Sequence, residues 1–267
     1  MSVELKKQED EPELLHAVAD NVMTITLNRP RTRNALTYAM YEGVASLCAE
    51  ALNREDVRAI ILTGVPRAFA AGTDIAQFRD LRTREDALAY EAKIERVVRQ
   101  IEDCARPTIA AISGACTGGG AMLAVACDLR IATRDARIGF PIARTLGNCL
   151  SVANYARLES LIGAARVKDL VFTARLISGE EAANAGFVSE TVDDHATLMA
   201  RARELALTIA GHAPLTLQAT KTALHRLRRR AAEVDGDDLV TACYLSEDFR
   251  EGIEAFLAKR QPAWRGK

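Results

Sequence analysis

The stretch PTIAAISGACTGGGAMLAVACDLRIA, which runs from Pro107 to Ala132, decides the fold class. Thr108 to Ile112 is a short apolar run after a proline, as expected of a buried strand. Gly114 to Gly120 is a glycine-rich turn, Ala121 to Ala126 has a helical composition, and Leu129 to Ala132 indicates a further strand. This alternation predicts an α/β protein with layers built from strand–strand–helix units.

The chain before this stretch continues the alternation. Asp20-Asn21 is a two-residue turn signal between two β-prone runs, which predicts a hairpin. Thr37 is a candidate N-cap, because its hydroxyl can accept a hydrogen bond from the first turn of a helix. The expected elements are strands Leu14 to Ala19, Val22 to Leu27 and Val57 to Thr63, and helices Thr37 to Asn53 and Glu85 to Cys104.

The last third of the chain has helical patterns and no convincing strand. We therefore expect an α/β core over residues 1–192 and an α-helical C-terminal region over residues 193–267. Because no sheet is left to cover these helices, their apolar faces need a partner. The expected helices are His195 to Gly211, Pro214 to Arg230 and Ser246 to Lys259.

The composition is that of an ordinary globular protein. Of the 267 residues, 49% are hydrophobic and 27% are charged, which argues against a disordered or membrane chain. The net charge of −1 gives no global field that would attract nucleic acid or an anionic membrane. The basic run His225 to Arg230 lacks interleaved aromatic residues, so we interpret it as a solvated or interface helix face and expect no nucleic-acid partner.

Cysteine and histidine usage argues against disulfides and metals, because no C-x-x-C pair occurs and the four histidines are scattered. Met1 to Leu15 lacks the apolar core of a signal peptide, and no run approaches the roughly 20 apolar residues that cross a bilayer. We expect buried thiols, no metal, no membrane partner and a cytoplasmic location. The six cysteines are Cys48, Cys104, Cys116, Cys127, Cys149 and Cys243.

Four segments resemble, in their order and spacing, the enoyl-CoA hydratase/isomerase (crotonase) family. They are Val22 to Leu36, Arg67 to Ile75, Pro107 to Ala132 and Gly252 to Gly266. The resemblance covers nearly the whole chain after the first dozen residues. It implies a crotonase-like spiral of repeated strand–strand–helix turns, a C-terminal region that forms a homo-trimer or a dimer of trimers, and an acyl-CoA thioester as substrate.

The resemblance also implies a backbone oxyanion hole, formed by the N–H groups of Thr73 and Gly119, that stabilises a thioester enolate. Gly72 lets the chain turn sharply before Thr73, and the glycines around Gly119 open a helix whose first N–H groups are unpaired. These glycines do not fit a nucleotide site. Leu123 stands where a G-x-G-x-x-G fingerprint needs its third small residue, so we expect no cofactor, with CoA being part of the substrate.

Both glutamates of the family's hydratases are missing. Met122 and Ile142 occupy the matching positions, and no Asp or Glu occurs from Ala136 to Leu158. Because hydration needs an acid and a base, worth roughly 10²–10⁴-fold each, hydratase activity is in doubt. Other polar residues are candidates for the substrate pocket. Arg144 suits a substrate carboxylate, Asn148 and Ser151 suit a water or a carboxylate, and Ser151 equally suits the start of a helix to Leu161.

Basic residues must meet the phosphates of CoA. Arg29 and Arg33 flank the exit of the hairpin, and Lys259 and Arg260 match a basic pair that the family uses close to the CoA of a neighbouring subunit. Asp74 also suits a helix cap for the segment after it. By resemblance, the CoA-binding positions are Arg29, Arg33, Ala35, Ala71, Asp74, Ile75, Lys259 and Arg260.

Four functions are compatible with these residues. The first is a CoA-thioester enzyme of the family with an oxyanion hole but without the hydratase pair. The second is a decarboxylase of a malonyl-CoA-type thioester, since loss of CO₂ generates an enolate without a base. The third is a double-bond isomerase with a remote carboxylate, and the fourth is a non-catalytic acyl-CoA binder. A cation placed for a free carboxylate would favour the decarboxylase, and a blocked acyl channel would favour the binder.

Overall fold

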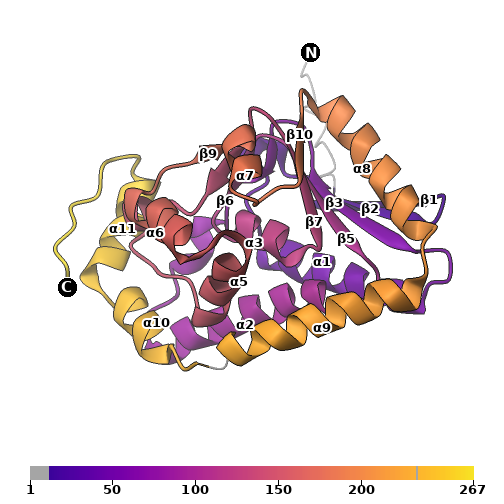
Figure 1. Cartoon of the computed structure of the whole chain (residues 1–267). Helices are drawn as coiled ribbons and strands as arrows, with labels where there is room; N and C mark the ends of the chain where they lie inside the picture. Colours follow the sequence, from indigo (N-terminus) through magenta and orange to yellow (C-terminus); the bar gives the residue numbers. More distant parts are fainter. Residues whose placement is uncertain (1–11, 233) are drawn as a thin grey trace, which may run out of the picture.

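The computed structural model describes residues 12–232 and 234–267 and contains two β-sheets (Figure 1). The six-stranded sheet has the order β1-β2-β3-β5-β7-β10, and the four-stranded sheet has the order β4-β6-β8-β9. The strands of the first sheet are β1 Leu14–Ala19, β2 Val22–Leu27, β3 Ala59–Gly64, β5 Thr108–Ile112, β7 Leu129–Thr133 and β10 Glu190–Val192. Those of the second are β4 Ala68–Ala70, β6 Ala115–Thr117, β8 Arg137–Gly139 and β9 Ile177–Ser178.

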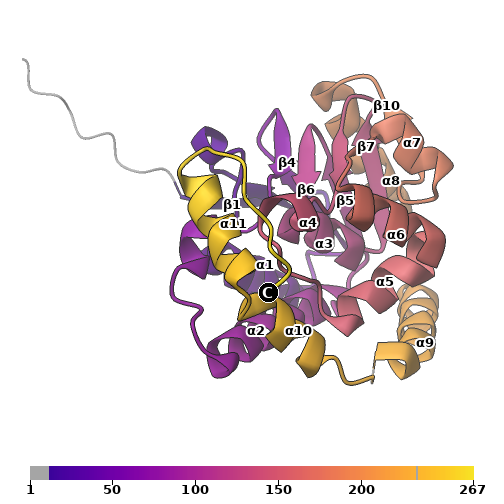
Figure 2. The same cartoon turned by 90° about the vertical axis from the view of Figure 1, so that its left-hand side faces the viewer.

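Successive strand pairs divide between the two sheets. β3, β5 and β7 enter the six-stranded sheet in parallel, while β4, β6 and β8, which follow them directly, enter the four-stranded sheet. A helix follows each pair, beginning with α2 (Arg84–Glu102) after β4 and α3 (Gly119–Ala126) after β6. The expected spiral of strand–strand–helix units is therefore confirmed (Figures 1 and 2).

Helices cover both faces of the six-stranded sheet, which explains why its central strands are apolar throughout. On one face, Leu198 and Ala202 of α8 (His195–Ala210) pack against Ile61 and Ile109. The other face belongs to the main core, which includes buried residues of α1 (Tyr38–Glu50), α2 and α3. The expectation that no sheet covers the C-terminal helices is therefore wrong for α8, because one face of the six-stranded sheet is free to receive its apolar side. The boundary near residue 193 stays a prediction.

Local signals predicted the longer elements, while the short strands β4, β8, β9 and β10, of two or three residues each, were not predicted individually. The Thr37 side chain accepts a hydrogen bond from Met40 N (3.2 Å), as expected of the N-cap of α1. The interpretation of Gly114 to Gly120 as a turn was wrong in its centre, where Ala115–Thr117 forms β6. The glycines at 114 and 118 have positive φ angles and make the turns on either side, while the residues between them pair with β4 and β8.

The remaining helices lie between the strands or after β10. Asp237–Tyr244 forms α10, which the sequence patterns did not predict, and it packs against α2. The expected C-terminal helices are otherwise present with small changes at their ends. The other helices are η1 Pro30–Thr32, η2 Ala51–Asn53, η3 Ile75–Phe78, α4 Ile142–Thr145, α5 Val152–Ile162, α6 Ala164–Thr173, α7 Gly179–Asn184, α9 Pro214–Ala232 and α11 Glu247–Leu257.

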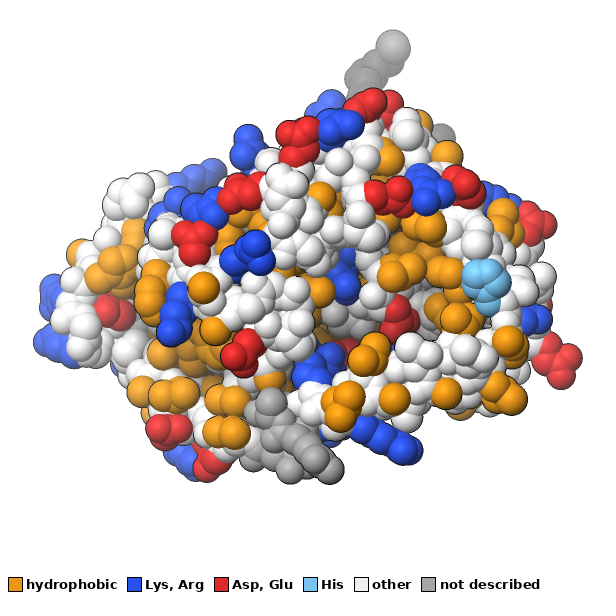
Figure 3. Space-filling model, viewed as in Figure 1, with side chains coloured by type: hydrophobic (Ala, Val, Ile, Leu, Met, Phe, Trp, Pro, Cys, Tyr) orange, Lys and Arg blue, Asp and Glu red, His pale blue; other side chains and the backbone are white. Residues whose placement is uncertain are grey.

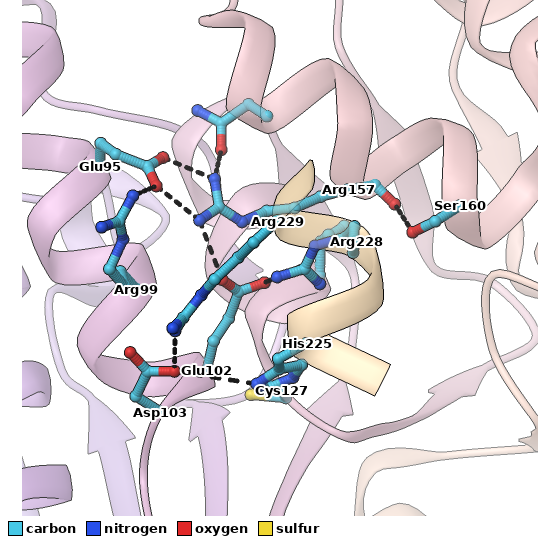
Figure 4. Close-up of polar contacts among 12 residues, drawn as sticks. Glu95, Arg99, Glu102, Asp103, Cys127, Arg157, Ser160, His225, Arg228 and Arg229 are labelled. Carbon is cyan, nitrogen blue, oxygen red and sulfur yellow. Dashed lines mark hydrogen bonds and ion pairs between the residues drawn. The ribbon is translucent and has the colours of Figure 1, made fainter. Parts of the chain in front are cut away.

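The basic run on α9 is held by acidic residues of α2 (Figure 4). Glu102 is buried and forms ion pairs with Arg228 (2.6 Å) and with Arg157 of α5 (2.9 Å). Arg229 pairs with Asp103. Since a buried carboxylate needs a countercharge, Arg228 is drawn inward, and the interpretation of this run as a solvated or interface face is wrong for Arg228.

Replacing Arg228 by Gln should lower the free energy of unfolding by about 1–3 kcal/mol, because Glu102 then loses one of its two buried partners. Arg229→Gln is the matched control. Its pair with Asp103 is exposed, so its loss should cost no more than about 1 kcal/mol. Urea denaturation of the two variants measures the difference. Equal losses would contradict the assignment of Arg228 to the buried network.

Exposed apolar side chains on α9 suit the predicted oligomer. Leu215, Leu224 and Leu227 are 78%, 60% and 69% exposed, and Figure 3 shows hydrophobic side chains along this helix. We therefore expect a trimer or a pair of trimers, because such faces usually have a partner. Light scattering at micromolar concentration should give three or six times the mass of one chain. A stable monomer would rule the assembly out.

The six cysteines are free thiols, four of them buried and Cys149 and Cys243 partly exposed. Within residues 12–232 and 234–267, no helix is long and apolar enough to cross a membrane. The same described ranges contain no group of three or more His, Cys, Asp or Glu residues suited to a metal ion.

Candidate active site

A cavity of about 560 Å³ is lined by the loops that follow β4 and β6. The first loop contributes Gly72 and Thr73, and the second contributes Gly118 and Gly119. Tyr244 of α10 and both Phe256 and Leu257 of α11 also line the cavity, so the C-terminal helices form part of its wall. Figures 1 and 2 show α10 beside α2.

The loop after β4 leaves the amide of Thr73 without a partner. Gly72 has a φ of +113°, which favours glycine, and its carbonyl accepts from Leu36 N at 2.8 Å. Asp74 N donates to Leu36 O at 2.9 Å. Thr73 lies between these two bonds, and within the described part of the chain its N–H has no acceptor.

The loop after β6 likewise leaves the amide N–H of Gly119 without a hydrogen-bond acceptor. Gly118 has a φ of +51° and its N–H donates to Gly139 O at 3.0 Å, and Gly119 then begins α3. The first N–H groups of a helix have no intrahelical acceptor. Among the described residues, no other acceptor reaches Gly119 N–H. Two unpaired amides therefore border one cavity from two loops.

The two loops are tied closely together. Thr117 donates its hydroxyl hydrogen bond to Ala71 O at 2.9 Å. A Cβ atom at Gly119 would lie 2.7 Å from Thr73 Oγ1 and 1.9 Å from Tyr41 Oη. Position 119 therefore requires glycine for close approach, which the glycine-rich sequence suggested only in general terms.

The Thr73 side chain belongs to an internal hydrogen-bond network. Its hydroxyl lies 2.8 Å from Tyr41 Oη and 3.4 Å from Tyr90 Oη. Burial raises the pKa of both tyrosines, and the hydrogen bond to Thr73 opposes this in part, so both stay protonated at neutral pH. The network fixes the loop that carries Thr73 N–H.

Glu91 of α2 is a carboxylate in this cavity that the sequence analysis missed. Tyr244 Oη donates to Glu91 Oε1 at 2.6 Å. Burial raises the pKa of Glu91 to about 7, the Tyr244 hydrogen bond opposes this, and the charge of Glu95 adds to it. One signal was available in the sequence, because Glu91 falls four residues after Ala87 and three before Ile94 on the buried stripe of the helix.

The chain is similar to known proteins over almost its whole length. The family model described as "Enoyl-CoA hydratase/isomerase" matches residues 17–267. The chain belongs to the enoyl-CoA hydratase/isomerase family. It is 35% identical over 256 residues to the "Probable enoyl-CoA hydratase" of Bacillus subtilis, covering 94% of this chain and 98% of that protein.

Two other similar proteins are named for reactions other than hydration. It is 30% identical over 258 residues to the "Delta(3,5)-Delta(2,4)-dienoyl-CoA isomerase, mitochondrial" of Dictyostelium discoideum, covering 91% of this chain and 87% of that protein. A structure of "Methylmalonyl-CoA decarboxylase in complex with 2-nitronate-propionyl-CoA" superposes with a TM-score of 0.86 at 28% identity, covering 96% of this chain and 99% of the other. The chain is thus an acyl-CoA-processing enzyme of a family with hydratase and isomerase members.

The enoyl-CoA hydratase/isomerase fold brings Met122 and Ile142 into the cavity wall. Met122 lies on α3, three residues after Gly119, and Ile142 begins α4 after Pro141. They are 2% and 6% exposed, so both are almost fully buried and make this part of the wall apolar. Neither side chain can exchange a proton.

The other pocket residues predicted from the sequence have different surroundings. Asn148 lines the cavity, and its Nδ2 donates to Tyr244 Oη at 3.3 Å. Arg144 is exposed and lies outside the cavity lining. Ser151 is also outside the lining and caps α5 by accepting from Asn154 N at 3.3 Å. The chain geometry therefore gives no support to a pocket role for Arg144 or Ser151.

The predicted CoA positions divide into two groups. Arg33, Ala35, Ala71, Asp74 and Ile75 line the cavity. Asp74 also caps η3, as expected, and pairs with Arg29 at 3.0 Å. Arg29 lies outside the cavity lining. So do Lys259 and Arg260 after α11, which are both exposed, with Arg260 paired to Glu251. Their place beside the CoA of a neighbouring subunit stays a prediction.

Proposed function

We propose that this enzyme stabilises the enolate of an acyl-CoA thioester, with Thr73 N–H and Gly119 N–H as the donors to the thioester oxygen. The observation that carries the proposal is the pair of unpaired amides on one cavity. Because fixed donors in a dry site stabilise developing negative charge far better than water does, such a pair is worth roughly 10²–10³-fold in rate per donor. Both residues act through their backbone N–H groups, so the contacts of the Thr73 hydroxyl do not change this role.

Hydration is not the reaction that we propose. Met122 and Ile142 lie in the cavity wall, at the positions where, by the resemblance, a hydratase of this family carries its acid and base. An apolar wall suits a reaction in which the enolate forms without an activated water. The acyl group of the substrate would lie against this wall, and Arg33 at the exposed side of the cavity would meet the charged part of CoA.

Decarboxylation of a malonyl-CoA-type thioester is the second candidate. It is supported by the apolar wall and by the likeness to a methylmalonyl-CoA decarboxylase. Two observations weigh against it. Among the described residues that line the cavity, Arg33 is the one Lys or Arg, and it is exposed. Glu91 also lies in the cavity, where its negative charge would repel a substrate carboxylate.

Infrared spectroscopy of bound butyryl-CoA, labelled with ¹³C at the carbonyl, tests the oxyanion hole directly. Two donors should polarise the carbonyl and lower its stretching frequency relative to free butyryl-CoA. A bound ligand with an unshifted carbonyl would contradict the proposal. Mass spectrometry after incubation with enoyl-CoA and malonyl-CoA thioesters then separates the candidates, since loss of CO₂ from malonyl-CoA would move decarboxylation into first place.

A further inference from the structure

We propose that Glu91 transfers protons at the carbon next to the carbonyl of the bound thioester, and that Tyr244 and Asn148 position it. This inference rests on the proposed function, because the α-proton becomes acidic only when the enolate is stabilised. It assigns a proton-transfer group on α2, away from Met122 and Ile142, where the family's hydratases carry theirs.

The carboxylate is held at one oxygen and free at the other. Tyr244 Oη donates to Glu91 Oε1 at 2.6 Å, and Asn148 Nδ2 donates to Tyr244 Oη at 3.3 Å. Among the described residues, Glu91 Oε2 has no hydrogen-bond partner and Glu91 has no ion pair. Asn148 Oδ1 is buried and has no partner within the same described ranges. Two acceptor atoms are therefore left for a ligand.

A chain of contacts joins Glu91 to the loop that carries Thr73 N–H. Thr73 Oγ1 lies 3.4 Å from Tyr90 Oη, and the rings of Tyr90 and Tyr244 are 5.9 Å apart. Tyr244 in turn holds Glu91. Thr73, Gly119 and Glu91 all line one cavity. A thioester bound at the two amides would therefore share that cavity with the Glu91 carboxylate.

The chemistry needs one group that can give back the proton it takes. Glu91 carboxylate removes a proton from the α-carbon, and the C–H electron pair becomes the enolate, whose charge rests on the thioester oxygen. The Glu91 carboxylic acid then returns the proton. Return to the α-carbon exchanges the hydrogen. When the substrate is a β,γ-unsaturated thioester, return to the γ-carbon moves the double bond into conjugation, without water and without a second acid.

The pKa of Glu91, raised to about 7 by burial, suits this double role, because both forms are populated at neutral pH. The exchange rate should rise with pH through about 7, as the basic carboxylate forms. Cys243 titrates nearby, since its hydrogen bond with Cys149 lowers its pKa to about 7, so a Cys243→Ser variant must keep the same profile. The titratable groups that interact with Glu91 through its charge or its hydrogen bond are Tyr41, Tyr90, Tyr155, Tyr244, Cys149 and Glu95.

The test is exchange of the α-hydrogens of butyryl-CoA in D₂O, followed by mass spectrometry. Glu91→Gln keeps an oxygen that accepts from Tyr244 but cannot take a proton, and should slow exchange by roughly 10²–10⁴-fold. Glu85→Gln, an exposed change in the first turn of the same helix, should leave exchange unchanged. Tyr244→Phe removes the hydrogen bond that lowers the pKa of Glu91. The pH at which exchange reaches half of its maximal rate should therefore be higher in this variant.

The outcomes separate this proposal from the proposed function. If Glu91→Gln exchanges as fast as the natural chain, Glu91 is not the proton-transfer group. The same conclusion follows if the natural chain binds butyryl-CoA with a shifted carbonyl but exchanges nothing. If the carbonyl is unshifted as well, the proposed oxyanion hole has also failed. The pH profile of the natural chain needs no variant, so an exchange rate that does not rise through about 7 overturns the proposal even if Glu91→Gln does not fold.

Discussion

Crotonyl-CoA should be hydrated by the natural chain very slowly or not at all. By the resemblance of the two loops, Met122 and Ile142 are predicted to stand where the family's hydratases carry glutamates, and each missing group is worth roughly 10²–10⁴-fold. Losing both leaves binding and enolate stabilisation, although paired groups need not be additive. Glu91 does not repair the loss, because hydration needs an acid and a base that share one water. The disappearance of the enoyl absorbance of crotonyl-CoA measures the rate.

The double change Met122→Glu with Ile142→Glu should introduce measurable hydration. Met122→Glu alone is the control and should restore little. A single carboxylate in this apolar wall has its pKa raised by burial and lacks the partner that orients the water. A natural chain that hydrates crotonyl-CoA at the rate of a good enzyme, on the order of 10–10³ per second, would show that another acid and base take the place of the missing pair.

Local signals explain why much of the fold could be predicted from the sequence. Thr37 and Asp74 cap the elements that follow them, and a cap needs only its own next few residues. The same is true of the glycines at 72 and 118, whose positive φ angles shape the two loops. β6 was missed because three residues carry too little periodicity to distinguish a strand from a turn.

The parts that could not be predicted depend on contacts between distant segments. Glu91 and Tyr244 are 153 positions apart, and only the packing of α10 on α2 brings the phenol to the carboxylate. Arg228 was misread for the same reason, since its partner Glu102 lies on another helix. Asn148 and Arg144 were both pocket candidates from the sequence, but only Asn148 contacts Tyr244, while Arg144 is exposed.

Removing the amide of Gly119 should lower turnover by roughly 10²–10³-fold, if that N–H is an oxyanion donor. Gly119→Pro alone would not isolate the donor, because any side chain there meets Tyr41 Oη at 1.9 Å. Tyr41→Phe removes that atom and also frees the Thr73 hydroxyl to turn away. The informative comparison is therefore Gly119→Pro against Gly119→Ala, both in the Tyr41→Phe background.

Both double variants carry a carbon at the same position, and they differ chiefly in the N–H. Gly119 is the first residue of α3, a position where proline is well tolerated, so the helix should survive in both. The proline variant should lose the shift of the bound carbonyl and most of the α-hydrogen exchange, while the alanine variant keeps both. Equal carbonyl shifts in two folded variants would remove Gly119 from the oxyanion hole and leave Thr73 N–H as the one proposed donor.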